Sequence, residues 1–306
     1  MSKFQKNLKK MATNKMLYIM ILPCMIYTFI FSYYPLGGWI MAFQNFKPAK
    51  GYSGSPFVGL QQFEFLFKDM DFWRSVRNTL AMSTMNLVFS FVFAIVFALL
   101  LNEIKNIGFK SITQTVSYLP HFLSWIIVCS LVSNMLSTND GAVNNALMAI
   151  GIIDKPVLWL GEPKYFWWIT TFANIWKETG WNSIIYIAAI AGIDQSMYEA
   201  ADLDGANRFQ KMFHITLPSI RPTIVVLLIM NLGWVMNASF EVPYILGTGL
   251  LQDVSQTIDI FVLKYGMSIG NYSLATAAGI FKSVISLILV FGTNAVANKL
   301  GENSLM

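Results

Sequence analysis

One stretch of the sequence repeats carboxamide, carboxylate and aromatic side chains at a regular interval inside an apolar run. Asn231, Trp234, Asn237, Glu241 and Tyr244 follow one another every three or four residues. Because an α-helix turns once in about 3.6 residues, this spacing predicts that all five share one helix face. Amide and carboxylate groups bind hydroxyls and aromatic rings cover C–H faces, so the predicted face suits a saccharide. Asn231 and Asn237 have an alternative role in hydrogen bonding to a neighbouring helix.

A second polar interruption lies within the apolar residues 165–190. It contains Trp176, Lys177, Glu178 and Trp181. Neighbouring residues on a helix point about 100° apart, so the sequence does not require Lys177 and Glu178 to bind one another. They face either two different helices or the external side, and a role in gating is a hypothesis. We add Trp176 and Trp181 to the five candidate pathway residues.

Other kinds of chemistry are poorly represented in the sequence. It has no GxxxxGK[ST] motif and no Gly-Lys pair, so the chain is not expected to hydrolyse ATP. Its two cysteines, Cys24 and Cys129, are too few for a disulfide framework and are interpreted as packing residues. Its two histidines, His121 and His214, have no companion at metal-ligand or nucleophile spacing. We therefore expect no metal site and no catalytic residue.

The elements that position these residues are predicted to be membrane spans. Hydrophobic residues make up 55% of the chain and charged residues 12%, with a mean hydropathy of +0.54. Roughly 20 mostly apolar residues are needed to cross a bilayer as a helix. Six segments satisfy this requirement: about 16–43, 78–101, 117–137, 165–190, 222–246 and 274–297. The predicted fold is an all-α polytopic membrane protein with six transmembrane helices.

Positive charge sets the predicted orientation. Five lysines precede the first span, namely Lys3, Lys6, Lys9, Lys10 and Lys15. By the positive-inside rule they place the N-terminus in the cytoplasm, and six crossings return the C-terminus there. The first apolar run is too long for a signal peptide and lacks a small-x-small cleavage site, which favours a retained anchor. The net charge of +5 comes from these inside lysines and does not indicate nucleic-acid binding.

A polar loop, residues 196–220, separates the fourth and fifth predicted spans. Ser196 and Glu199 have the spacing of a capping box, which predicts that a short helix begins at Ser196. Gly205 allows a turn that residues with a Cβ resist. A second short helix is predicted after it, bounded by Pro218 and Pro222. The expected structure is two short helices at an angle.

The same loop resembles the EAA motif of the permease subunits of binding-protein-dependent ABC importers. That motif is E-A-A, three residues, Gly, nine residues, I-x-L-P, and seven positions match it: Glu199, Ala200, Ala201, Gly205, Ile215, Leu217 and Pro218. Further strings, FWRSVRNTL, SYLPHFLSW, WKETGW and NYSLATAAGIFKS, are similar to permeases of complex-saccharide importers in the maltose-type branch. The resemblance covers about residues 72–298 and is weaker in the first span.

This resemblance implies a type I importer fold, with a five-helix core, a preceding helix that wraps a partner, and a cytoplasmic coupling helix. It also implies a multi-pass protein of the bacterial inner (cytoplasmic) membrane. The implied partners are a second homologous permease, two copies of an ABC ATPase, and a lipid-anchored or periplasmic solute-binding protein that delivers a saccharide. ATP and Mg would bind the ATPase, and this chain would bind no cofactor.

In such an importer the polar loop transmits closure of the ATPases to the spans. We expect charged side chains of the loop to position it on the ATPase by hydrogen bonds, and apolar side chains to enter a cleft in the ATPase. The candidate coupling residues are Glu199, Ala200, Ala201, Asp204, Gly205, Arg208, Phe209, Met212, Phe213 and Pro218. Alternatively, Phe209, Met212 and Phe213 pack the loop against the chain's own helices.

The expected division of the chain is into three parts. Residues 1–72 hold the cytoplasmic N-terminus, the first helix and an outer loop. Residues 73–298 form the core with the EAA loop 196–220, and residues 299–306 form a short cytoplasmic tail. The alternative functions are a self-sufficient secondary carrier or channel and, more remotely, a membrane-embedded enzyme. A secondary carrier usually shows an internal inverted repeat, and none is evident between the two halves of the sequence.

Overall fold

A computed structural model describes residues 14–237 and 240–299, so the lysines at positions 3 to 10 and the tail 300–306 lie outside the described residues. The described chain is helical apart from turns and one bridge between Gln44 and Phe57. Four helical runs are long and apolar enough to cross a membrane: Lys15–Phe43, Met70–Asn102, Arg208–Leu232 and Tyr272–Ala295. A bent pair of helices, Ile107–Phe122 with Trp125–Met135, is a candidate fifth span.

The predicted fourth span is helix α9 (Pro163–Ala191), which does not meet the same test. Its polar residues, Lys177 and Glu178 among them, keep its hydropathy below that of the other four. It is nevertheless at the centre of the molecule, because it packs along α5 (Met70–Asn102). Ala94 and Ala98 of α5 and Tyr186 of α9 share a core with Ile220 of α12 (Leu217–Leu232). Small residues allow these helices to approach closely.

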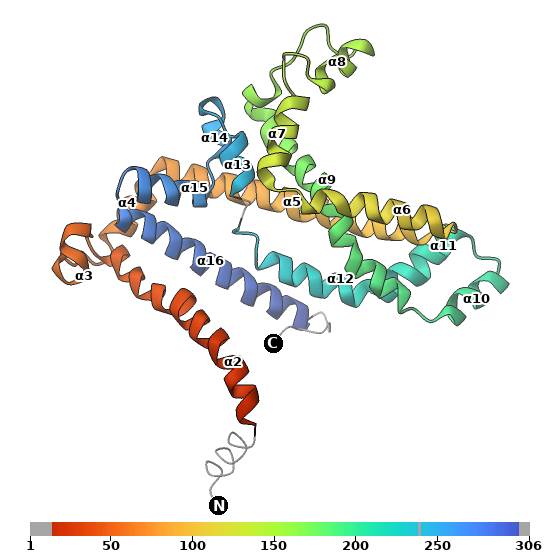
Figure 1. Ribbon diagram of the computed structural model, residues 1–306, viewed down its shortest axis with the longest axis horizontal. Helices are drawn as coiled ribbons and strands as arrows, with labels where there is room; N and C mark the ends of the chain where they lie inside the picture. The colour runs from red at the N-terminus through yellow and green to blue at the C-terminus, as the bar shows by residue number, and fades with distance from the viewer. Residues whose placement is uncertain (1–13, 238–239, 300–306) are drawn as a thin grey trace, which may run out of the picture.

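Only the last part of the first run joins this bundle, where residues 34–43 pack against α16 (Tyr272–Lys299). The run comprises α2 (Lys15–Thr28), a π-helical turn (Phe29–Tyr33) and a 3-10 segment (Tyr34–Phe43). In the described part of this run only Ala42 is buried, and Figure 1 shows α2 (red) leaving the other helices. Every residue of α2 is exposed, and an apolar helix of this kind requires lipid or another protein around it.

The third predicted span, 117–137, is wrong as a single straight helix. The chain instead forms α6 (Ile107–Tyr118), a 3-10 turn (Leu119–Phe122) and α7 (Trp125–Met135), with a bend of 101°. Pro120 lies in the turn, and the Ser124 hydroxyl then accepts a hydrogen bond from the Ile127 amide at 3.4 Å. A proline and a new N-cap this close together favour ending one helix and starting another.

The fifth predicted span, 222–246, is also wrong in its bounds. The helix begins earlier, as α11 (Arg208–Lys211), passes through a π-helical turn (Met212–Thr216) and continues as α12, so Pro218 and Pro222 do not end it. It stops at Leu232 and turns follow over residues 233–236, and α13 (Glu241–Leu246) is a separate helix. Pro218 lies at the start of α12, where a missing amide costs little, whereas Pro222 lies inside the helix.

Two ends of the bundle are distinct in Figure 1. One end carries α10 (Gln195–Leu203) and α11. The other carries α3 (Gly51–Gly54), α4 (Gln61–Lys68) and α15 (Ile258–Leu263), where α16 (Tyr272–Lys299) also begins. At this second end Leu66, Phe72, Phe261 and Ala277 form a buried core. Helices α8 (Ala142–Ala149) and α14 (Gln252–Ser255) complete the α-helices of the described residues.

Candidate functional site

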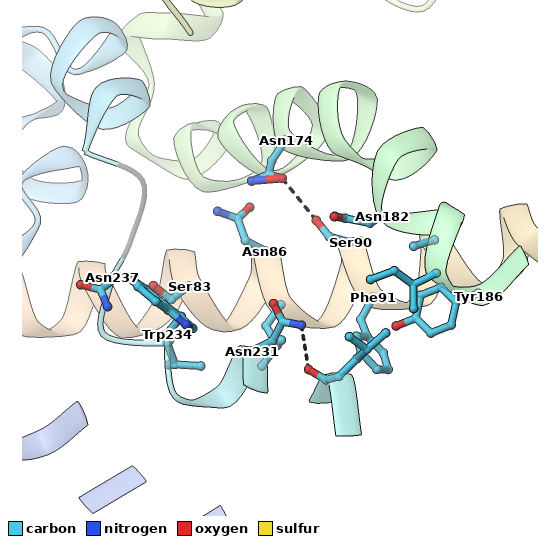
Figure 2. Close-up of a pocket in the computed structure, with 15 residues that line it drawn as sticks. Ser83, Asn86, Ser90, Phe91, Asn174, Asn182, Tyr186, Asn231, Trp234 and Asn237 are labelled. Carbon is cyan, nitrogen blue, oxygen red and sulfur yellow. Dashed lines mark hydrogen bonds between the residues drawn. The ribbon is translucent and has the colours of Figure 1, made fainter. Parts of the chain in front are cut away.

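A cavity of about 360 Å³ opens between α5, α9 and α12. Figure 2 shows side chains from all three helices around it. Its polar lining consists of Ser83, Asn86, Ser90, Asn174, Asn182, Tyr186, Asn231, Trp234 and Asn237. Five of these are asparagines, and none of the lining residues carries a formal charge at neutral pH. The cavity is therefore a neutral surface rich in hydrogen-bonding groups within an apolar bundle.

Several of these groups have hydrogen-bonding capacity to spare. Asn174 accepts a long bond of 3.4 Å from Ser90, and Asn231 donates to the Leu227 carbonyl at 2.7 Å. Asn86 Oδ1 and Ser83 Oγ are buried and have no hydrogen-bond partner in the described part of the chain. A buried polar atom without a partner costs free energy, so it marks a place where a ligand or water binds.

The backbone around the cavity is itself unusual. After Leu232 the chain forms turns over residues 233–236, and Asn237, which follows these turns, also lines the cavity. Irregular backbone at membrane depth is tolerated only where it is buried in protein or lines a cavity that admits water. The chain can therefore leave the helical conformation after Leu232 because it lines the cavity there.

The sequence prediction for this region is partly wrong. Asn231, Trp234 and Asn237 lie at the cavity, but they do not share a continuous helix face with Glu241 and Tyr244, because the helix ends before Trp234. Glu241 and Tyr244 lie on α13, and Tyr244 lines a different hollow. The residues that the sequence analysis missed are Ser83, Asn86, Ser90, Asn174 and Asn182. Asparagine recurring inside apolar spans was the available signal.

Trp176 and Trp181 do not line this cavity. The Trp181 ring instead stacks on the His121 ring, with centroids 4.2 Å apart and planes at 2°. Glu178 binds His121 Nδ1 at 2.7 Å through one oxygen and Lys177 Nζ at 2.9 Å through the other. Lys177 also donates to the His121 carbonyl at 2.7 Å. The sequence did not require Lys177 and Glu178 to bind one another, and the structure joins both of them to His121.

His121, Lys177, Glu178 and Trp181 connect the bend between α6 and α7 to α9. Replacing Glu178 tests how much this contact stabilises the protein. Glu178→Ala leaves the Lys177 side chain, which is only 6% exposed, without a carboxylate. We expect the variant to lose about 3 kcal/mol of stability, since a buried charge without its partner is costly. Thermal unfolding of the detergent-purified chain measures the loss. The control is Glu64→Ala, which breaks an exposed pair with Lys68 and should leave unfolding unchanged; equal shifts in both variants would contradict the prediction.

The polar loop forms two short helices, but with different caps from those predicted. Helix α10 starts one residue earlier than expected, and its N-cap is Asp194, whose carboxylate accepts from the Ser196 amide at 2.9 Å. Hydrogen bonds from the Ser196 backbone and hydroxyl lower the pKa of Asp194. The capping box instead joins Asn207 and Gln210 at the start of α11. Gly205 has φ of +75°, as a left-handed turn requires.

Contacts within the loop hold the two helices together. Lys211 Nζ binds Asp202 Oδ1 at 2.6 Å, and the Tyr198 and Thr216 hydroxyls are 2.8 Å apart. The predicted coupling residues Glu199, Ala200, Asp204, Gly205, Arg208 and Pro218 are exposed, and Ala201 is half-buried. Most of the predicted coupling residues therefore lie on the surface of the described chain.

The three apolar candidates of the loop differ in their burial. Phe209 and Phe213 are 71% and 56% exposed, as a contact with a partner requires. Met212 packs against the core that joins α5, α9 and α12, as the alternative prediction expected. Leu203 at the end of α10 is 91% exposed and was missed, because a single leucine beside aspartates gives no periodic signal. Exposed apolar groups gathered in one place mark an interaction surface.

Comparison with known proteins gives close relatives over nearly the whole chain. Protein LplB of Bacillus subtilis (strain 168) is 40% identical over 292 residues, covering 95% of this chain and 91% of LplB. The polygalacturonan/rhamnogalacturonan transport system permease protein YteP of the same organism is 40% identical over 303 residues, covering 99% and 94%. A crystal structure of a bacterial ABC transporter involved in the import of the acidic polysaccharide alginate superimposes with a TM-score of 0.89 and 38% identity, covering 96% of this chain and 99% of that one.

Residues 90–302 match the family model of the binding-protein-dependent transport system inner membrane component. The match includes the whole EAA loop and most of the residues around the cavity, so the resemblance stated from the motif is confirmed. It also decides against a self-sufficient carrier and an enzyme. The chain belongs to the family of inner-membrane components of binding-protein-dependent transport systems, and it is a multi-pass permease subunit of an ABC importer whose ATPase is a separate subunit.

Proposed function

We propose that the amide-lined cavity is this subunit's part of a saccharide pathway. The observation that carries the proposal is a neutral cavity with five asparagines at a broken helix, inside the helical bundle. Carboxamides both donate and accept hydrogen bonds, which matches the two roles of a sugar hydroxyl. Trp234 is 68% exposed and adds an aromatic face for the C–H side of a sugar ring.

The relatives support the class of substrate. YteP is named for the transport of polygalacturonan and rhamnogalacturonan, and the matching crystal structure is of an alginate importer. Both kinds of substrate are saccharide chains with many hydroxyl groups. The absence of a charged side chain among the cavity-lining residues supports recognition of those hydroxyls rather than of carboxylates at this place.

The proposed assembly completes the pathway. A second permease supplies the opposite wall, and a solute-binding protein docks at the end carrying α4 and α15. One of two ATPases docks at α10, and the other docks on the second permease. The exposed Leu203, Phe209 and Phe213 are the proposed apolar contacts with an ATPase, which binds the ATP and Mg. We further propose six crossings of the bacterial inner membrane, with α9 as the fourth, and cytoplasmic termini. The division at residues 1–72, 73–298 and 299–306 remains part of this proposal.

Asn86→Leu tests the pathway directly. Asn86 Oδ1 has no partner in the described chain, so the substitution should leave folding intact while removing a group available to the sugar. We expect uptake of saccharide by the reconstituted importer to fall about tenfold, the upper effect of one lost hydrogen bond. Val88→Leu, on the outer side of the same helix, should leave uptake unchanged. Normal uptake by Asn86→Leu would remove the cavity from the pathway.

A further inference from the structure

A second hollow of about 290 Å³ lies between α13 and α15, at the end of the molecule away from α10 (Figure 1). Its polar lining is made of Tyr244, Thr248, Gln252, Ser255, Gln256, Lys264 and Ser268. No candidate role in the sequence analysis involves this set apart from Tyr244. We call this hollow the outer groove.

The chemistry of the outer groove resembles that of the cavity. The Tyr244 side chain is 54% exposed, and its ring stacks on Phe240 with centroids 5.0 Å apart and planes at 19°. Gln252 is exposed, and its amide is held in place by a bond from Nε2 to Gln256 Oε1 at 3.1 Å. A rigid aromatic platform beside a fixed carboxamide suits the apolar face and the hydroxyls of a sugar ring.

Hydrogen bonds to α5 hold the wall of the outer groove in place. Gln256 is buried and donates to the Ser75 hydroxyl at 3.0 Å, which ties the groove wall to α5. Asn78, which also lies on α5, donates its side-chain amide to the Gln256 backbone carbonyl at 3.0 Å. Lys264 is the ionisable group of the lining other than the Tyr244 phenol, and its Nζ is 4.0 Å from Asp71 Oδ2. The groove is therefore neither loose nor strongly charged.

The outer groove and the cavity both adjoin α5. Gln256 of the groove wall binds Ser75 and Asn78 of this helix, and the cavity lining on the same helix begins at Ser83. With volumes of about 360 and 290 Å³, each hollow is at the small end of the range for ligand sites. A saccharide of several units would exceed either one alone.

We propose that the outer groove is a second saccharide subsite, which holds the trailing units of an oligosaccharide while its leading units occupy the cavity. This inference rests on the proposed saccharide pathway and adds chain-length selection to it. Short saccharides need only the cavity, whereas longer ones also gain the contacts with Tyr244 and Gln252. The groove residues therefore affect long substrates selectively.

The test compares di- and pentasaccharides in the complete reconstituted importer. Oligogalacturonides, alginate oligosaccharides and malto-oligosaccharides are screened with the wild type, and the transported series is used. For Tyr244→Ala and for Gln252→Ala we expect the KM for the pentasaccharide to rise about three- to tenfold, with the disaccharide KM unchanged. Tyr244→Phe keeps the ring and should retain most of the pentasaccharide affinity. Ile245→Ala, an exposed neighbour outside the groove, is the matched control.

The outcomes separate this inference from the function on which it rests. Asn86→Leu should impair both chain lengths, because both pass through the cavity. If it does so while the groove variants leave the pentasaccharide KM unchanged, or raise both KM values equally, the outer subsite is refuted and the pathway remains. If no series is transported, or if Asn86→Leu has no effect, the saccharide pathway itself fails.

Discussion

Gly205→Pro is expected to abolish transport while the chain still enters the membrane in normal amounts. Gly205 has φ of +75°, and its amide donates to the Asp202 carbonyl at 3.1 Å. Proline fixes φ near −65° and removes that donor, so the turn between α10 and α11 cannot keep its form. A distortion of about 3 kcal/mol or more at the surface that meets the ATPase corresponds to a loss of at least about 100-fold. Uptake by the reconstituted importer measures the loss.

Gly205→Asn is the matched control for this experiment. Asparagine tolerates the left-handed conformation better than other residues with a Cβ, and no atom lies within 4 Å of the position that a Cβ would take. We expect it to retain most of the transport. Membrane amounts of both variants should equal the wild type, since the turn lies outside the spans. Near-normal uptake by Gly205→Pro at a normal amount would rule out a coupling role for the turn.

Gly180→Ala is expected to be the most destabilising single-methyl change in the bundle. A Cβ at Gly180 would lie 2.1 Å from the carbonyl oxygen of Ser117 and 2.5 Å from its carbonyl carbon. These are backbone atoms of α6, which cannot rotate away as a side chain can. Overpacking of this kind costs roughly 3 kcal/mol, and α6 must move away from α9 to accept it. Thermal unfolding of the purified chain should show a large decrease in midpoint.

Gly279→Ala applies the same substitution where there is room. No atom lies within 4 Å of its Cβ position on α16, so the change should be neutral or should stabilise the helix by up to about 1 kcal/mol. If the unfolding midpoint falls for Gly180→Ala but not for Gly279→Ala, the destabilisation comes from the contact between α6 and α9. If the unfolding midpoint falls equally for both variants, the contact between α6 and α9 is not the cause and the prediction is wrong.

The sequence by itself determined the class of protein and its family. Apolar runs long enough to span a bilayer leave few alternatives to a helical membrane protein, because the backbone must satisfy its own hydrogen bonds in lipid. The EAA pattern placed Gly205 at a turn, and the structure has that turn. Such features depend on residues close together in the chain, so local spacing is sufficient to find them.

Only the tertiary structure decided what lines the pathway. Asn86, Asn174 and Asn231 lie on three different helices, and no local pattern reveals that they converge. The end of α12 at Leu232 was likewise hidden, since the spacing of Asn231, Trp234 and Asn237 remains compatible with a helix. The bond between Lys177 and Glu178 depends on the His121 turn, which comes from another part of the chain. Packing between distant segments sets these contacts, because each polar group in an apolar bundle takes the partner that the fold brings to it.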